Sequence, residues 1–260
     1  MTVVSSLRQR ATVSLILLRV IARSRIHVGV LSSFAVIIAA CVVSVDLATG
    51  EEARSFAALS LFLSSLAMNV VAAATALVVV ESSMRGAAAE QLLTRDRANS
   101  YLVVSGIVAL QIAVVLCGCV FGALLLCVSR VVVPFPGIQL LVGMSSAVIE
   151  AMIVGQLVFA LRLRLGRAVT LAVAPAWWLL GRLDGLIEDM VTRGMFGASA
   201  FVMRFVVYFI PRLGTIDLMS ASTDGPVSSE RIQLTLSLGS LYIFSYMVLA
   251  MLLFRRRLER

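Results

Sequence analysis

The chain has 260 residues, of which 60% are hydrophobic and only 14% are charged, and its mean hydropathy is +1.03. Soluble domains are about 45–50% apolar and about 25% charged, so this composition excludes a soluble enzyme or binding domain and predicts one polytopic all-α membrane domain. The net charge is +8, which on its own would fit a nucleic-acid-binding protein. Because the arginines cluster at the ends of apolar runs, membrane topology explains them better, and we expect no nucleic-acid partner.

The N-terminal residues 2–26 mix arginines with leucines and valines in a pattern that favours an interfacial helix. Arg8, Arg19 and Arg23 fall within roughly 60° of one another when each residue turns the helix by about 100°. Such a face would meet anionic lipid headgroups while the apolar side chains enter the membrane. The alternative is a charged tail that only precedes the first membrane span.

Apolar runs long enough to cross a bilayer, which takes about 20 residues, follow one another along the rest of the chain. The fifth run predicts a short or broken span, because it contains Pro175 and ends in charged residues. After it, residues 194–210 predict an additional outer helix, either re-entrant or amphipathic. In total we predict six membrane spans, at residues 28–45, 56–80, 101–128, 138–161, 168–187 and 232–254.

The distribution of arginine sets the predicted orientation of these spans. With both termini inside, 15 of the 22 arginines fall in cytoplasmic segments and seven, including Arg182, fall in outer segments. An excess of this kind marks the cytoplasmic side of membrane proteins. We therefore predict a multi-pass protein of a bacterial cytoplasmic (inner) membrane with both termini in the cytoplasm.

The intramembrane polar candidates in the predicted spans are Asn69, Gln111 and Glu150. A carboxylate in lipid is expensive, so Glu150 is by default a candidate for a functional site. The interpretation that we favour is structural, with Glu150 protonated or hydrogen-bonded to Asn69, Gln111 or Gln156. A proton relay is poorly supported, because no second acid or histidine lies near the centre of a span.

Small residues in the spans are expected to serve packing. Gly118 and Gly122 have the GxxxG spacing that lets two helices approach closely. We expect this spacing to be used inside the bundle, and dimerisation is the alternative. The cysteines have no histidine or carboxylate nearby, so we expect packing residues and no metal site, at Cys41, Cys117, Cys119 and Cys127.

Residues 81–100 form the longest predicted cytoplasmic loop and connect the second span to the third. Most residues from Ala87 to Leu93 are good helix formers, so we expect a short helix there. A helix flanked by two spans would offer a soluble motor a place to act on the membrane domain. The alternative is a loop whose arginines only set topology. The residues assigned to this contact are Arg85, Gly86, Glu90, Leu92, Leu93, Arg95 and Arg97.

Three segments are similar to the permease subunits of ABC-2 type transporters, in particular the branch associated with maturation of multicopper enzymes and nitrous-oxide reductase. They are LRQRATVSLILLRVIARSRIHVGVL at the start of the chain, Glu81…Arg85-Gly86…Leu92-Leu93…Arg97…Tyr101, and Ile210-Pro211-Arg212-Leu213-Gly214-Thr215-Ile216-Asp217-Leu218. Pro211 and Asp217 belong to the outer motif of the third segment. Two positions depart from the family pattern, because Asp96 stands about where the family has proline and Arg212 replaces asparagine.

The resemblance implies a six-helix half-transporter spanning residues 1–260, which pairs with a second permease copy or a paralogue and with two ATPase subunits in the lipid bilayer. ATP and Mg²⁺ would be bound by that ATPase, because this chain contains no lysine and therefore no GxxxxGK[ST] phosphate loop. We expect no catalytic residue and no cofactor in this chain, which would move a substrate, by export, across the membrane. A non-transporting membrane scaffold or assembly factor is the alternative. A membrane enzyme using Glu150, or the acids at 184, 188 and 189, is the least favoured possibility.

Overall fold

The structure is a computed structural model that describes residues 2–24, 52–85, 98–132, 135–195 and 210–258, together with 29, 32, 35–36, 39, 197 and 201–203. These residues form helices joined by turns, and no strand occurs among them. Four of the helices are long and apolar enough to cross a membrane. The predicted all-α class is thus confirmed, but six spans are not, and the predicted span 28–45 lies largely outside the described residues.

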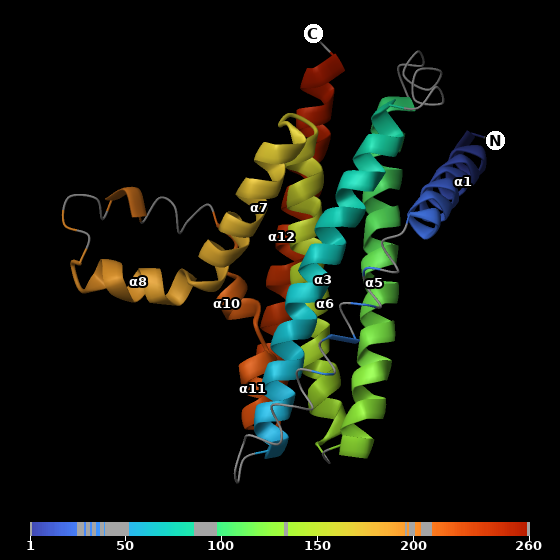
Figure 1. The fold of residues 1–260 in the computed structure, drawn as a ribbon. Helices are drawn as coiled ribbons and strands as arrows, with labels where there is room; N and C mark the ends of the chain where they lie inside the picture. Colours follow the sequence, from blue (N-terminus) through green and yellow to red (C-terminus); the bar gives the residue numbers. More distant parts are fainter. Residues whose placement is uncertain are drawn as a thin grey trace.

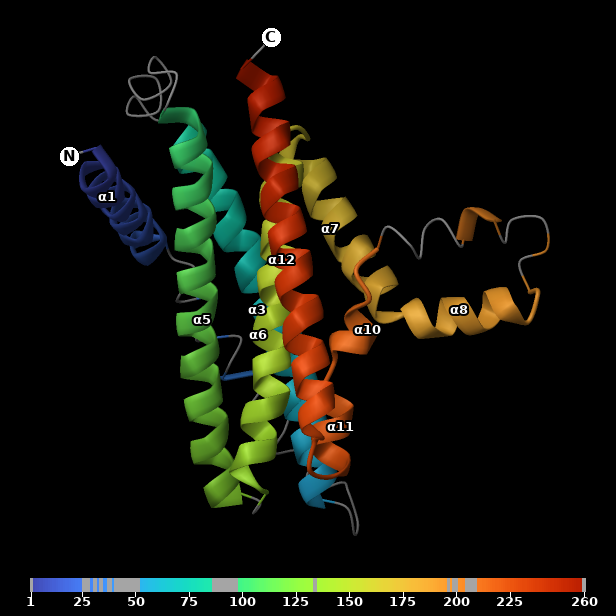
Figure 2. The same ribbon diagram turned by 180° about the vertical axis from the view of Figure 1, so that it is seen from behind.

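The four long helices form the body of the molecule and run side by side (Figures 1 and 2). Each contains one predicted span entirely. The central helix is α6, because 72% of its most apolar stretch is buried, the largest share among the four, against 17% for α12. The four are α3 (Glu52–Arg85), α5 (Ala98–Val132), α6 (Gly137–Arg162) and α12 (Ser229–Leu258).

The segments predicted to be cytoplasmic meet at one end of this bundle. The end of α3, the start of α5, the turn at residues 163–166 and the C-terminal end of α12 all lie at the top of Figure 1. The turn before α6 and the start of α12 lie at the opposite end. Helices α3, α5 and α6 therefore alternate in direction, and α12 runs in the same direction as α6 (Figure 1).

Close packing of the bundle depends on small residues. A side-chain carbon on Gly118 of α5 would collide with Val148 of α6, and one on Gly122 would lie 3.7 Å from Met144. The GxxxG spacing is therefore used between α5 and α6, as predicted. A side-chain carbon on Gly155 would lie 3.2 Å from Ala72 of α3 on the other side of α6.

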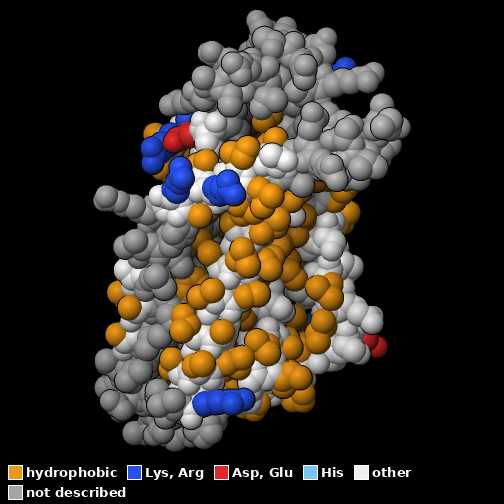
Figure 3. Space-filling model, turned by 90° about the vertical axis from the view of Figure 1, so that its right-hand side faces the viewer, with side chains coloured by type: hydrophobic (Ala, Val, Ile, Leu, Met, Phe, Trp, Pro, Cys, Tyr) orange, Lys and Arg blue, Asp and Glu red, His pale blue; other side chains and the backbone are white. Residues whose placement is uncertain are grey.

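The outward face of α5 is as apolar as a lipid-facing surface has to be. Exposed side chains recur every three or four residues along it, at Val108, Ile112, Val115, Leu116 and Val120. On the face shown in Figure 3, hydrophobic side chains cover the middle and basic side chains gather near the two ends. This arrangement matches a hydrocarbon layer bounded by two charged interfaces.

The N-terminal helix α1 (Thr2–Arg23) lies beside the N-terminal half of α5, where the Ser14 hydroxyl donates to the Ser105 carbonyl (Figure 1). Ser14, Leu17 and Ile21 are buried on one face of α1, whereas Arg19 and Arg23 are exposed. The predicted helix is therefore present, and it ends at Arg23 rather than at residue 26. Its position on a membrane surface stays a prediction.

The fifth predicted span, at residues 168–187, does not cross the bundle as one helix. Helix α7 (Arg167–Arg182) ends at Arg182, and α8 (Asp184–Thr192) leaves the bundle sideways, near the middle of the bundle's length (Figure 1). Pro175 lies inside α7 without ending it. The chain turns at Leu183, which has φ −91° and ψ 9°, and we call residues 181–184 the elbow.

After α8 the chain returns to the bundle through two short helices, α10 (Leu213–Ile216) and α11 (Met219–Asp224). Helix α10 lies next to the elbow, and α11 lies near the start of α3 (Figure 1). Asp224 forms an ion pair with Arg54 of α3. The outer helix predicted at residues 194–210 lies mostly outside the described residues.

Candidate functional site

The candidate site is centred on Glu150, which lies near the middle of α6 and is only 3% exposed. Its partner is Arg182, at the last residue of α7. The Arg182 Nε donates to Oε1 of Glu150 at 2.9 Å, and Nη2 donates to Oε2 at 2.8 Å. Two parallel bonds of this kind form the strongest geometry available to an arginine and a carboxylate.

Two further donors complete the shell around the carboxylate. The Ser65 hydroxyl of α3 donates to Oε2 of Glu150 at 3.0 Å, and the indole N–H of Trp178 donates to Oε1. The Arg182 guanidinium also lies 5.5 Å from the Trp178 ring and 5.9 Å from the Phe62 ring, within cation–π range. The buried charge pair is therefore bonded from three helices.

Adjacent tryptophans fix the position of α7, because neighbouring helical residues point about 100° apart. Trp178 points toward α6 and bonds Glu150. Trp177 points toward α12, where its N–H donates to the Tyr246 hydroxyl at 3.2 Å. Helix α7 is thus attached to two different helices one turn before its end.

Asp217, at the end of α10, adds a second acid to the site. Its Oδ2 lies 3.7 Å from Nη1 of Arg182, and its Oδ1 accepts the Met219 amide at 2.8 Å. Burial raises the pKa of Asp217 above its ordinary value, although the Met219 amide and Arg182 act in the opposite direction. Arg182 therefore lies between two carboxylates, and the bidentate bond goes to Glu150.

The chain between α8 and α12 returns to the bundle at residues 210–224, which we call the return segment, and it packs directly on the elbow. A side-chain carbon on Gly181 would lie 2.8 Å from the Pro211 carbonyl oxygen. One on Gly214 would lie 2.5 Å from Oδ1 of Asp184. These two glycines therefore permit backbone contacts that any larger side chain would prevent, and the break in α7 is held by contacts from a segment far along the chain.

The return segment is in turn bonded to α12. The Arg212 amide donates to the Tyr242 hydroxyl at 3.2 Å, and the Thr235 hydroxyl donates to the Ile216 carbonyl at 3.4 Å. The elbow consequently lies between α6, which bears Glu150, and the return segment, which is hydrogen-bonded to α12.

At this site the carboxylate of Glu150 and the guanidinium of Arg182 neutralise each other's charge. Both oxygens of Glu150 are bonded, so the carboxylate is poorly placed to act as a base. No group of three potential metal ligands occurs within the described residues. Removing one partner of such a pair is strongly destabilising, because the other charge is left buried. The arrangement is thus suited to holding the elbow in one position, or to releasing it when the bonds break.

The intramembrane residues predicted from sequence are only partly brought together. Glu150 bonds neither Asn69, Gln111 nor Gln156, so the expected partners are wrong, and Arg182 takes their place. Asn69 lies beside the site, with its amide nitrogen 3.5 Å from the Ser65 hydroxyl. Gln111 lies on α5 and is half-buried, whereas Gln156 is buried without a hydrogen-bond partner in the described structure.

Arg182 was predicted to lie near the outer surface, and this prediction is wrong, because Arg182 lies inside the bundle against Glu150. A usable signal was present: Arg182 follows Trp178 by four residues, so both lie on the same face of α7. Of the outer motif, Asp217 reaches Arg182 and Pro211 contacts Gly181.

Almost all of the residues assigned to the contact with an ATPase lie outside the described residues. Arg85 is the last residue of α3, and its side chain is not described. The other six assigned residues, Gly86, Glu90, Leu92, Leu93, Arg95 and Arg97, lie outside the described residues. Their role stays a prediction.

Comparisons with family models, with curated proteins and with solved structures each find no match to this chain.

Proposed function

We propose that this chain is the membrane-spanning permease subunit of an ABC-2 type transporter, which moves a substrate outward across a bacterial inner membrane. The observation that supports transport is the interrupted crossing formed by α7 and α8, together with the charge cluster at its break. Interrupted helices with polar groups near the middle of the bilayer are characteristic of secondary transporters, where they form the binding region. The extension to an ABC permease rests on analogy and on the sequence resemblance.

A non-transporting scaffold is the second candidate, and the same observation disfavours it. A protein that only anchors partners needs continuous apolar helices, such as α5 and α12. Burying Glu150, Arg182 and Asp217 together in the middle of a bundle adds a desolvation cost without improving the anchor. Intramembrane charges of this kind are expected where a membrane protein moves or binds something.

In this proposal a separate ATPase acts on residues 81–100. Helix α3 would carry the motion, since it leads from that segment to Ser65 in the cluster, roughly 30 Å away at about 1.5 Å per residue. Two ATPase subunits would bind ATP and Mg²⁺, and a second permease copy or a paralogue would complete the assembly. The chain itself would hold no cofactor and catalyse no reaction.

Substitution of the two leucines in the loop tests this proposal. Leu92→Asp with Leu93→Asp should leave the protein inserted and folded but abolish the ATP-hydrolysing activity that copurifies in mild detergent, because a few buried apolar anchors dominate most interfaces. The matched control is Ala87→Ser with Ala88→Ser, which adds polarity to the same segment and should leave the ATPase bound to the chain.

If the leucine variant keeps its ATPase at wild-type stoichiometry, the contact lies elsewhere, and the loop at residues 162–167 is the next candidate. If the wild-type chain copurifies with no ATP hydrolysis at all, the scaffold is favoured. Orientation is tested separately with Arg164→Cys and Ser228→Cys, two exposed positions at opposite ends of the bundle. We expect a membrane-impermeant thiol reagent to label only Ser228→Cys in intact cells.

A further inference from the structure

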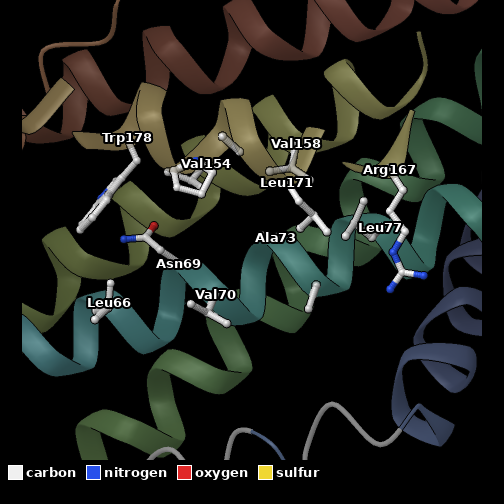
Figure 4. Close-up of a pocket in the computed structure, with 13 residues that line it drawn as sticks. Leu66, Asn69, Val70, Ala73, Leu77, Val154, Val158, Arg167, Leu171 and Trp178 are labelled. Carbon is white, nitrogen blue, oxygen red and sulfur yellow. The ribbon is translucent and has the colours of Figure 1, made fainter. Parts of the chain in front are cut away.

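A groove between α3, α6 and α7 lies next to the charge cluster and shares Trp178 with it. Its volume is about 350 Å³, within the range of sites that bind small molecules. Side chains of leucine, valine, alanine and proline form most of its lining. Figure 4 shows the two ends, with Arg167 at one and with Asn69 and Trp178 at the other.

The first end of the groove favours an anion. Arg167 is exposed and makes no ion pair with any other described side chain. It is also the first residue of α7, where no side chain caps the backbone N–H groups. A helix start and an arginine act in the same direction, since both attract negative charge.

The other end of the groove contains an unsatisfied acceptor. Asn69 is only 6% exposed, and its Oδ1 has no hydrogen-bond partner in the described structure. In Figure 4 the Asn69 side chain points toward Trp178, across the end of the groove. A buried amide oxygen left without a donor costs about 1–3 kcal/mol, so a donor is expected there.

Neither water nor a plain acyl chain satisfies this site well. A buried water needs two to four polar partners, and around Asn69 the groove lining offers only apolar side chains and Trp178, whose N–H already bonds Glu150. An acyl chain would fill the apolar section but would leave Oδ1 of Asn69 unbonded. The occupant has to combine an apolar chain with a donor.

We propose that this groove binds a single-chain anionic amphiphile whose anionic group lies at Arg167 and whose far end donates a hydrogen bond to Asn69. Asn69 and Leu77, which both line the groove, lie eight residues apart on α3 and therefore roughly 12 Å apart along it, which sets the length of chain that the groove takes. The site goes beyond the proposed transport function and requires no ATPase.

Trp178 provides a local reporter for the test. The chain has two tryptophans, and only Trp178 lines the groove, since Trp177 bonds Tyr246 of α12. A Trp177→Phe background therefore leaves one indole at the end of the groove. In detergent, ω-bromododecanoate should quench this indole saturably, because bromine would lie beside it when the carboxylate lies at Arg167.

Each end of the site is then tested with its own substitution. Arg167→Met should raise the half-saturating concentration of ω-bromododecanoate about fivefold and leave that of ω-bromododecanol unchanged, because the alcohol has no charge. In competition, ω-hydroxydodecanoate should displace the brominated probe at about fivefold lower concentration than dodecanoate, and Asn69→Leu should abolish that preference.

Three outcomes would overturn the proposal. Equal quenching by the acid and the alcohol in every variant would show simple partition into the detergent micelle. Saturable quenching without any preference for the hydroxylated acid would remove Asn69 from the site. Absence of quenching from a particle with the mass of two chains would show that a second copy covers the groove.

Discussion

Helices α6 and α7 are both apolar, yet one crosses the bundle without interruption and the other stops midway. The difference lies in where each carries its charge. Helix α6 holds Glu150 in its interior and continues for 12 residues beyond it to Arg162, whereas α7 ends at Arg182 and the chain turns away. Each of these charges would be expensive in its own helix without a partner.

The carboxylate in α6 and the break in α7 therefore depend on each other. Arg182 can lie at this depth because Glu150 neutralises it, and Glu150 can lie inside α6 because Arg182 reaches it. Asp217, which the return segment brings to the elbow, contributes from a greater distance. Substitutions that separate these elements should therefore show which bonds matter most.

The largest effect is expected from Arg182→Met, which leaves Glu150 buried without its cation. We expect a loss of about 3–5 kcal/mol in stability, since breaking one side of a buried pair has that cost. The loss is measured by heating the protein in detergent and using size-exclusion chromatography to quantify the fraction that stays folded at each temperature. Arg193→Met is the matched control, because Arg193 pairs with Asp189 at an exposed site and should change little.

Glu150→Gln should have a smaller effect than Arg182→Met. The amide oxygen keeps one acceptor for Arg182, and Asp217 remains as a counter-charge at 3.7 Å. We expect a loss of about 1.5–3 kcal/mol, the range for hydrogen bonds to charged groups, and a larger loss for Glu150→Leu. If the two variants unfold at the same temperature, hydrogen bonding at this position is unimportant.

Gly214→Ala tests the contact between the return segment and the elbow. Its new carbon would lie 2.5 Å from Oδ1 of Asp184, so we expect a loss of about 1–3 kcal/mol. Gly185→Ala is the control, because nothing lies within 4 Å of a carbon at that position of α8 and alanine favours a helix. Similar unfolding temperatures for the two variants would mean that the contact is not close.

The smallest effect, at most about 1 kcal/mol, is expected from Asp217→Asn, and its sign depends on pH. Since burial raises the pKa of Asp217, the folded protein binds that proton more tightly than the unfolded chain does. The stability gained from the proton is complete below the ordinary pKa and is lost as pH rises through the raised one.

Wild type should therefore lose unfolding temperature relative to Asp217→Asn as pH rises from about 4 to about 7, the interval above the ordinary aspartate pKa. Parallel thermal scans of the two proteins across this interval measure the difference. The opposite trend would show that Arg182 dominates and lowers this pKa.

The sequence predicts the long helices well, because a bilayer crossing depends on local apolar content alone. It indicates a short or broken fifth span, but it does not place the break at the elbow. The break at Leu183 depends on Gly181 and Asp184 fitting against Pro211 and Gly214, about thirty residues later. No periodicity within α7 carries that information, and Pro175, the usual sign of a break, proves to lie inside the helix.

For a similar reason the sequence predicts one member of the charge pair, Glu150, and not its partner, Arg182. Glu150 is conspicuous because it is a lone charge in an apolar run. Arg182 was counted as an outer charge, since a topology rule treats every arginine near a span end alike. Pairing the two requires knowing that α7 packs against α6 in one particular register, which only the three-dimensional arrangement supplies.

A double-mutant cycle between Glu150 and Arg182 tests the central claim most directly. The stabilities of wild type, Glu150→Gln, Arg182→Met and the double variant are measured under one detergent condition. If the two side chains stabilise the bundle as a pair, the double variant loses less than the sum of the single losses, by about 2 kcal/mol or more. Losses that add to within about 0.5 kcal/mol would contradict the claim, because side chains that do not interact behave in that way.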